Sequence, residues 1–218
     1  NHLSGYFYDV DFLFPDERKE SFKNDYLTFV TNTVDDKKRI LSTLLEIALI
    51  DPAYKNKLEE FYNANNATTK KFGTYWMQAI NASPNIAPSI SLYMLNRKLF
   101  SSKQLSGKWI LVDFWGTWCG PCREEHPDLQ KFCDSIVVTK LENISLLTIA
   151  CRDTEEKVLN YLHEKQLTFP VAMSDNRIEH AYAVQGYPAK MLITPEGKYI
   201  TIPFGIDWLN FVKQYCDL

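Results

Sequence analysis

Two cysteines separated by two residues constrain the fold of this chain more than any other feature. Cys119 and Cys122 enclose a Gly-Pro pair, directly after the apolar run 109–115 and at the start of a predicted helix. The unpaired N–H groups and the dipole at a helix N-terminus favour a thiolate at Cys119. A thiolate is the attacking form of cysteine, and Cys122, one turn inward, can then release a mixed disulfide by attacking Cys119. The spacing therefore predicts a redox-active dithiol, with Cys119 attacking and Cys122 resolving.

A metal site is the main alternative for a CxxC pair. Zinc usually takes four Cys or His ligands, and the chain has no second CxxC or CxxH. His126, four residues after Cys122, leaves a Cys/Cys/His copper site as a further alternative. The chain has five cysteines, an odd number that cannot form a complete set of intrachain disulfides. The redox interpretation is favoured, with no metal, and the three remaining cysteines are expected to be free: Cys133, Cys151 and Cys216.

The overall charge argues against nucleic acid as a partner. The 218 residues include 24 Lys and Arg against 27 Asp and Glu, for a formal net charge of −3, and there is no basic tract. The longest apolar runs, such as 144–151, are far shorter than the ~20 residues of a membrane span. The length and composition are those of an ordinary folded protein of one or two domains.

The first part of the chain, residues 1–86, is predicted to be an all-α region of unknown role. Asp35 and Asp36 could cap a helix over 37–50, and Asp51-Pro52 could start another. A further short helix carries Tyr75, Trp76 and Ile80. The segment 82–88 contains two prolines, which oppose both helix and sheet, and is predicted to be a linker.

The pattern changes at residue 87. A hairpin is expected around Asn96-Arg97, followed by strands that alternate with helices, which predicts a mixed sheet flanked by helices. The predicted strands are 109–115, 144–151, 169–173, 191–194 and 199–202, and the predicted helices 119–133, 154–165 and 207–215.

The sequence Val112-Asp-Phe-Trp-Gly-Thr-Trp-Cys-Gly-Pro-Cys122 resembles the active-site strand and loop of thioredoxins. The wider order resembles the TlpA/ResA branch of extracytoplasmic thiol–disulfide oxidoreductases over residues 87–218. This resemblance implies a thioredoxin-like domain in that range. It rests also on the following segments: Ala87-Pro88, Cys122-Arg-Glu-Glu-His-Pro127, the insertion 148–170, Ala181-Tyr-Ala-Val-Gln-Gly-Tyr-Pro-Ala189 and Leu192-Ile-Thr-Pro-Glu-Gly197.

The resemblance also implies a substrate-binding face. Tyr187-Pro188 matches the loop whose proline is cis in the family and faces the cysteine pair. The residue before that proline offers backbone hydrogen bonds to a substrate. Trp118 is expected to flank Cys119, and the substrate-contacting set then comprises Trp118, Gly120, Pro121, Tyr187 and Pro188.

Two acids are implied to act on the cysteines. Asp113 matches the buried acid beneath the CxxC pair, and because burial disfavours a charged carboxylate, it could accept the proton of Cys122. Glu125, one helical turn after Cys122, matches the acid that tunes the cysteines in the ResA branch. Cys151 falls where thioredoxins place a lysine near the buried acid, so Asp113 would lack that partner unless Arg152 or another group supplies it.

The sequence thus predicts an enzyme that exchanges disulfides with protein dithiols or disulfides. It needs no cofactor, because the dithiol carries both electrons. The Gly-Pro pair favours a reductase, and the resemblance implies an extracytoplasmic location with a membrane electron donor. A disulfide isomerase that uses the helical region as a platform, and a redox-sensing binding protein, remain as alternatives. A peroxidase is disfavoured by the missing Pro-x-x-x-Thr-x-x-Cys motif before Cys119. The aromatic, acidic segment Tyr6–Phe14 weakly resembles extensions that precede such domains in exported proteins.

Overall fold

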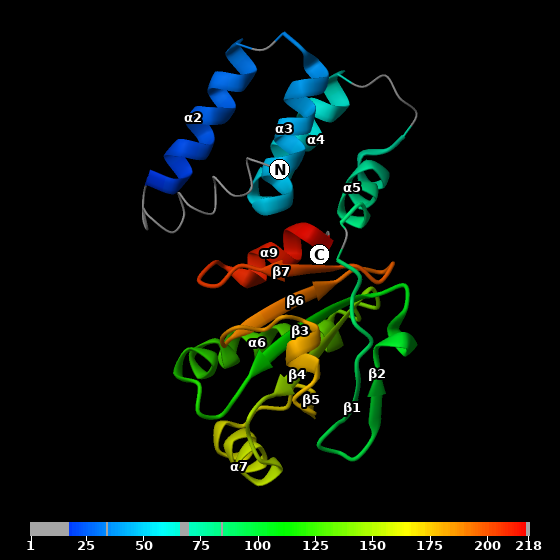
Figure 1. The fold of residues 1–218 in the computed structure, drawn as a ribbon, viewed down its shortest axis with the longest axis vertical. Helices are drawn as coiled ribbons and strands as arrows, with labels where there is room; N and C mark the ends of the chain where they lie inside the picture. The colour runs from blue at the N-terminus through cyan, green and yellow to red at the C-terminus, as the bar shows by residue number, and fades with distance from the viewer. Residues whose placement is uncertain (1–17, 34, 66–69, 84, 217–218) are drawn as a thin grey trace. The chain divides into compact units, whose positions relative to one another are not determined.

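The computed structural model describes residues 18–33, 35–65, 70–83 and 85–216. The chain divides into two compact units, Asn1–Ile80 and Asn81–Leu218, which Figure 1 shows as blue-to-cyan helices and a green-to-red sheet domain. The segment Tyr6–Phe14 lies outside the described residues.

The first unit is helical, and its helix starts follow the local sequence. Asp36 accepts hydrogen bonds from the backbone N–H groups of Lys38 and Arg39, so it caps α3 as predicted. Asp51 accepts from the N–H of Ala53 and starts η1 in the same way. The helices predicted over 37–50, from Asp51 onward and around Tyr75 to Ile80 are therefore confirmed, and α2 is an additional helix. The elements are α2 (Arg18–Thr33), α3 (Lys37–Ile50), η1 (Pro52–Tyr54), α4 (Lys55–Asn65) and α5 (Phe72–Asn81).

The second unit is built on a five-stranded mixed sheet in the order β5-β4-β3-β6-β7 (Figure 1). β3 pairs in parallel with β4 and antiparallel with β6, so it lies at the centre. Every residue of β3 is buried, which explains why its sequence is an almost continuous apolar run. The predicted mixed α/β sheet is confirmed. The sheet strands are β3 (Trp109–Trp115), β4 (Ile144–Ala150), β5 (Val171–Met173), β6 (Ala189–Ile193) and β7 (Tyr199–Ile202), and a separate hairpin pairs β1 (Ser91–Tyr93) with β2 (Leu99–Ser101).

Alternate residues of β3 serve two different environments. Ile110, Val112 and Phe114 join an apolar core with the hairpin and α8. Asp113 and Trp115 point to the other face, because successive strand residues point to opposite faces. There, Trp115 packs edge-on against His126 of α6. The helices of this unit are η2 (Ser102–Leu105), α6 (Gly120–Val138), α7 (Glu155–Lys165), α8 (Ile178–Ala181) and α9 (Trp208–Cys216).

The structure differs from the predicted elements at one helix end, at one missed helix and at the predicted linker. α6 extends past Cys133 to Val138, so that cysteine is a half-buried mid-helix residue rather than a helix end. α8 was not predicted. The supposed linker is part of the sheet domain from residue 85, because the N–H of Ala87 bonds to Gly197 and the carbonyl of Asn85 accepts from Tyr199. The open edge of β7 offers unpaired backbone groups, and this outweighs the nearby prolines.

Candidate active site

The two cysteines lie where β3 ends and α6 begins, and they form a disulfide. Cys119 is the N-cap of α6, and its Sγ accepts a hydrogen bond from the backbone N–H of Cys122 at 3.2 Å. Gly120 and Pro121 are the first two residues of the helix. Both cysteines are almost fully buried. The N-terminus of α6 therefore presents a backbone donor directly to the sulfur of Cys119.

The loop that leads into Cys119 is fixed on both sides. The N–H of Thr117 donates to the Asp153 carboxylate at 2.7 Å, and Trp118 Nε1 donates to the carbonyl of Cys151 at 3.2 Å. A Cβ at Gly116 would lie 2.4 Å from Trp118 Nε1, so only glycine permits this indole position. Trp118 is half-exposed beside the cysteine pair.

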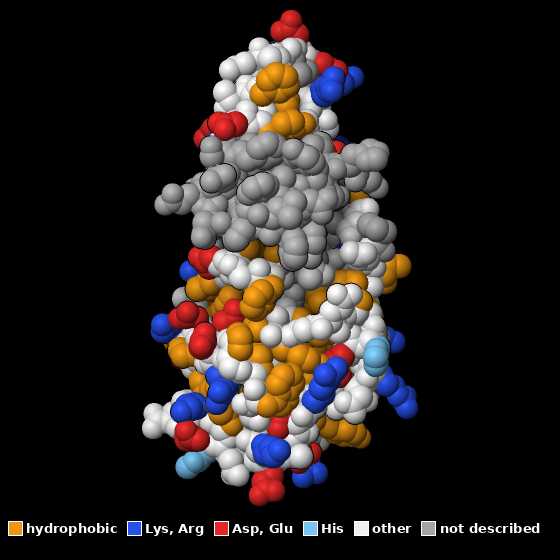
Figure 2. All heavy atoms as spheres, turned by 60° about the vertical axis from the view of Figure 1, so that its left-hand side comes forward, with side chains coloured by type: hydrophobic (Ala, Val, Ile, Leu, Met, Phe, Trp, Pro, Cys, Tyr) orange, Lys and Arg blue, Asp and Glu red, His pale blue; other side chains and the backbone are white. Residues whose placement is uncertain are grey.

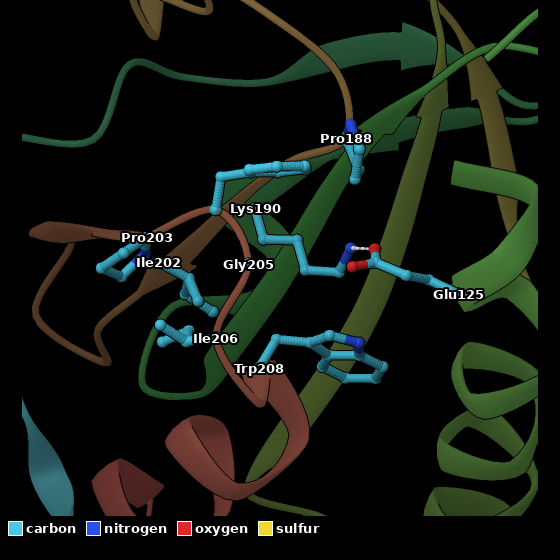
Figure 3. A pocket seen from close by; sticks show the side chains of 9 residues that line it. Glu125, Pro188, Lys190, Ile202, Pro203, Gly205, Ile206 and Trp208 are labelled. Atoms are coloured by element: carbon cyan, nitrogen blue, oxygen red, sulfur yellow. Dashed lines mark hydrogen bonds and ion pairs between the residues drawn. The ribbon is translucent and has the colours of Figure 1, made fainter. Parts of the chain in front are cut away.

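Asp113 of β3 is buried and has a cationic partner that the sequence did not reveal. Lys190 stands directly opposite Asp113 in the β3–β6 register, and its Nζ lies 2.9 Å from Asp113 Oδ1. The same ammonium donates to Glu125 Oε2, as the dashed line in Figure 3 shows. Its Nζ also lies 5.4 Å from the centre of the Trp208 ring. One buried cation thus joins the two acids that the sequence singled out.

The charges explain why Lys190 stays protonated inside the protein. Burial alone would lower the pKa of Lys190, but the carboxylates of Asp113 and Glu125 outweigh burial and raise it. Arg152, the partner suggested from the sequence, instead places its guanidinium 5.7 Å from the centre of the Tyr187 ring. A lysine inside the short apolar run of β6 was the available sequence signal, because a buried lysine needs a partner.

The loop before β6 forms the opposite wall of the site. The Tyr187–Pro188 peptide bond is cis. The Tyr187 ring packs edge-on against Trp118, with centroids 5.2 Å apart, and its hydroxyl donates to Glu179 at 2.7 Å. Ser174 also donates to this carboxylate. Sequence reasoning missed Glu179 because α8, which carries it, has only four residues.

Glu179 is a buried carboxylate with neutral donors. Burial opposes its charged form, but hydrogen bonds from Ser174 and Tyr187, together with the charge of Arg152, outweigh that effect and lower the pKa of Glu179. Burial and the nearby charge of Glu179 raise the pKa of the Cys151 thiol. A protonated, buried thiol is a poor nucleophile. Cys151 is therefore a small buried residue, whose thiol donates to the carbonyl of Ile149 at 3.4 Å.

A small pocket lies between α6, β6 and the start of α9. Figure 3 shows the Lys190 side chain crossing it towards Glu125, with Pro188 on one side and Trp208 on the other. Its outer rim is the β7–α9 loop, where Phe204 is 73% exposed and Ile206 40%.

On the face drawn in Figure 2, basic and acidic side chains of the described residues are intermingled rather than separated by sign.

Comparison with known proteins shows which family the chain belongs to. A profile described as "AhpC/TSA family" matches residues 84–201, more than half of the chain and including both cysteines. The chain belongs to the AhpC/TSA family. Within it, the chain is 29% identical over 133 residues to "Thiol-disulfide oxidoreductase ResA" of Bacillus subtilis (strain 168), which covers 61% of this chain and 73% of that protein. It is 30% identical over 132 residues to "Thioredoxin-like protein YneN" of the same organism, covering 61% and 77%.

Solved structures agree with this family assignment. A thiol:disulfide interchange protein of Chlorobium tepidum TLS has a TM-score of 0.54 and 27% identity, covering 61% of this chain and 94% of that one. A thioredoxin domain of a thiol–disulfide oxidoreductase from Bacteroides vulgatus gives a TM-score of 0.53 and 26% identity, covering 61% and 96%. The predicted thioredoxin-like fold is confirmed. With the Cys119–Cys122 disulfide, this member of the AhpC/TSA family is a thiol–disulfide oxidoreductase.

Two further observations concern the described part of this family member. None of its helices there combines the length and the apolar character that a membrane span requires. In the same residues, no three His, Cys, Asp or Glu side chains converge as a metal site would require.

Proposed function

We propose that this protein reduces disulfide bonds in other proteins outside the cytoplasm. The observation that carries the proposal is the position of Cys119 as the N-cap of α6, with its sulfur accepting the N–H of Cys122. Such a donor stabilises a thiolate more than a neutral thiol. Reduced Cys119 attacks a substrate disulfide, forming a mixed disulfide and releasing one substrate thiolate. Cys122 then attacks Cys119, which releases the second substrate sulfur and closes the disulfide.

Asp113 accepts the proton of Cys122 in this scheme, and Glu125 adjusts the charge around it. Asp113 is 1% exposed and shares Lys190 with Glu125. A carboxylate is one of the side chains that act as a general base, and Asp113 lies on the strand that leads into the cysteine loop. Lys190 keeps two carboxylates together in a space that could not hold both charges without a cation.

The face for the protein substrate consists of the groups around the cysteine pair. Trp118 is 49% exposed and packs on Tyr187, next to Pro188. Gly120 and Pro121 follow Cys119 on the surface side of the helix start, and the apolar rim of the small pocket continues beyond Pro188. Exposed aromatic and apolar groups beside a polar centre are typical of a protein-binding surface.

The location outside the cytoplasm and a membrane electron donor are supported by the resemblance to the TlpA/ResA branch. A reductase becomes oxidised in each cycle, so it needs a donor of two electrons to regenerate Cys119 and Cys122. In an oxidising compartment that donor must draw its electrons from elsewhere, and a membrane protein would supply this connection.

Reduction of insulin disulfides by dithiothreitol tests the proposal. The wild-type protein is expected to accelerate insulin precipitation, and Cys119→Ser to abolish the acceleration. Cys122→Ser should retain a mixed disulfide between Cys119 and insulin, which mass spectrometry of the alkylated complex would identify. Cys133→Ser, a substitution elsewhere in α6, is the matched control and should keep the wild-type rate. Equal rates for wild type and Cys119→Ser would refute the proposal.

A further inference from the structure

His126 connects the interior of the site with a surface groove. It lies one helical turn after Cys122 on α6 and is 1% exposed. Its Nδ1 is 2.8 Å from the hydroxyl oxygen of Tyr161 on α7. Its Nε2, at the other side of the ring, is buried without a hydrogen-bond partner. The two ring nitrogens of His126 therefore face different surroundings.

The inner nitrogen belongs to a group of orphaned polar atoms. Within the described residues, the buried side-chain atoms that lack a hydrogen-bond partner are Asp113 Oδ1, Trp115 Nε1 and His126 Nε2. The 2.9 Å contact of Asp113 Oδ1 with Lys190 is an ion pair without hydrogen-bond geometry. Asp113 and Trp115 are alternate residues of β3 and share one face. The His126 ring packs edge-on against Trp115 on that face, with centroids 4.5 Å apart.

The charge of Asp113 acts on the His126 ring, so the carboxylate and the imidazole are near neighbours inside the protein. Buried polar groups are almost always hydrogen-bonded, and buried waters typically satisfy two to four of them. Asp113 supplies an acceptor, Trp115 a donor, and neutral His126 either one, depending on its tautomer. A water between the Asp113 carboxylate and Nε2 of His126 would give both groups a hydrogen-bond partner.

The outer nitrogen leads to solvent. Tyr161 is half-buried and lines a groove of about 570 Å³ between α6 and the end of α7. Arg123 and Lys165 also line this groove, which reaches Gly120 beside Cys119. The Tyr161 hydroxyl is thus positioned between the buried imidazole and water in the groove.

We propose that His126 relays a proton between the buried acid Asp113 and the groove, through the Tyr161 hydroxyl. The inference rests on the proposed function, because it concerns the proton that Cys122 loses. After Asp113 has accepted that proton, it passes through the bridging water to Nε2, while Nδ1 releases its own proton through Tyr161 to the groove. The ring is then left in the other tautomer. When a donor reduces the disulfide, one proton moves inward by the same steps and restores the first tautomer.

The surroundings of His126 favour a neutral imidazole, which can pass a proton on without keeping it. Burial, helped by the charges of Lys190 and Arg123 and opposed by that of Asp113, lowers the pKa of His126 to about 4. The imidazole is therefore neutral near pH 7, with one nitrogen free to accept. Glu125 is 30% exposed and also reaches Asp113 through Lys190, so it offers a second route to solvent.

The test is the oxidation of the reduced protein by a saturating disulfide-bonded peptide, followed by stopped-flow tryptophan fluorescence at pH 5–8 in H₂O and D₂O. We expect Tyr161→Phe and His126→Phe to slow the step about tenfold. That is less than the 10²–10⁴ of a sole general base, because Glu125 provides a second route. Adding Glu125→Gln to Tyr161→Phe should slow it further. Both single variants should change the solvent isotope effect and leave the equilibrium redox potential near the wild-type value.

Two controls keep the outcome decisive. Tyr93→Phe, on an exposed hairpin tyrosine, should keep the wild-type rate. Imidazole added to His126→Ala should restore part of the lost rate, and if that variant does not fold, Tyr161→Phe carries the test alone. Wild-type rates and isotope effects in Tyr161→Phe would overturn the relay. If the wild-type protein itself shows no Cys119-dependent oxidation by the peptide, the proposed function fails instead.

Discussion

Two buried carboxylates of the sheet domain, Asp113 and Glu179, have different kinds of partner. Asp113, under α6, is paired with the ammonium of Lys190. Glu179, under the cis-proline loop, is held by neutral donors, the hydroxyls of Ser174 and Tyr187. In a buried ion pair both groups are ionisable, so the pair interacts strongly with any neighbouring group that gains or loses a proton. A carboxylate surrounded by hydroxyl donors is fixed in place by them.

The contrast separates two tasks of one site. The Asp113 side has a titratable network that includes Lys190, Glu125 and His126, and it is suited to moving protons. The Glu179 side connects to Tyr187 and so to Trp118, and it is suited to holding the substrate face in shape. Substitutions on the first side should therefore alter proton transfer or the charge next to the cysteine pair, and those on the second side should alter substrate binding.

Removing the cation should have the largest effect. Lys190→Met leaves Asp113 buried without its partner, and loss of one member of a buried pair costs about 3–5 kcal/mol of unfolding free energy. Urea unfolding at pH 7 would measure this loss. Lys213→Met, an exposed position on α9, is the matched control and should change stability by less than about 0.5 kcal/mol. If Lys190→Met also costs less than that, the ion pair does not hold the Asp113 side together.

Lowering the pH should reduce the stability of the folded protein through protonation of His126. Its folded pKa of about 4 lies below the unfolded value of about 6.5, so the unfolded chain binds more protons between these values. Stability from this group is fully present above pH 6.5 and falls by about 3 kcal/mol as the pH drops to 4. Urea unfolding of wild type and His126→Phe across this range would isolate the contribution. Parallel pH curves for the two proteins would contradict it.

Glu179→Gln should have a smaller effect, confined to the loop side. The amide nitrogen of the glutamine would face the hydroxyl of Ser174 or Tyr187, each of which donates to a Glu179 oxygen in the wild type. The lost hydrogen bond should lower the free energy of unfolding by about 2 kcal/mol. The KM for a peptide disulfide should rise, with the redox potential close to the wild-type value. A changed potential with an unchanged KM would reverse the assignment of the two sides.

Tyr187→Phe should have the smallest effect. It keeps the ring against Trp118 and removes one hydrogen bond to a charged group, worth about 1.5 kcal/mol. Thermal unfolding measured alongside Glu179→Gln would show whether the two losses overlap. In the double variant the combined loss should be smaller than the sum, because both changes break the same contact. Full additivity would mean that the hydroxyl does not act through Glu179.

The sequence predicted the parts of this molecule that local chemistry decides. The run 109–115 is apolar because every residue of β3 is buried, and Asp36 caps a helix through its own side chain. The CxxC pair is recognisable because a strand, a loop and a helix start are adjacent in the chain. Each of these features depends on residues that are close together in the sequence.

The remaining parts depend on contacts that sequence order does not show. Lys190 and Asp113 are 77 positions apart and meet only because β6 is antiparallel to β3 in one particular register. Glu179 lies on α8, whose four residues are too few to show helical periodicity. The pairing of Asn85 and Ala87 with the edge of β7 likewise depends on which strand ends the sheet.

An equilibrium redox titration of the Cys119–Cys122 pair tests the central claim most directly. The protein would be equilibrated with thiol buffers at pH 7 and alkylated, and the two cysteines would be read by mass spectrometry separately from Cys133, Cys151 and Cys216. A reductase predicts a midpoint near about −270 mV, at the thioredoxin end of the scale. A midpoint near about −120 mV would show that the disulfide form is a strong oxidant and would contradict the reducing direction.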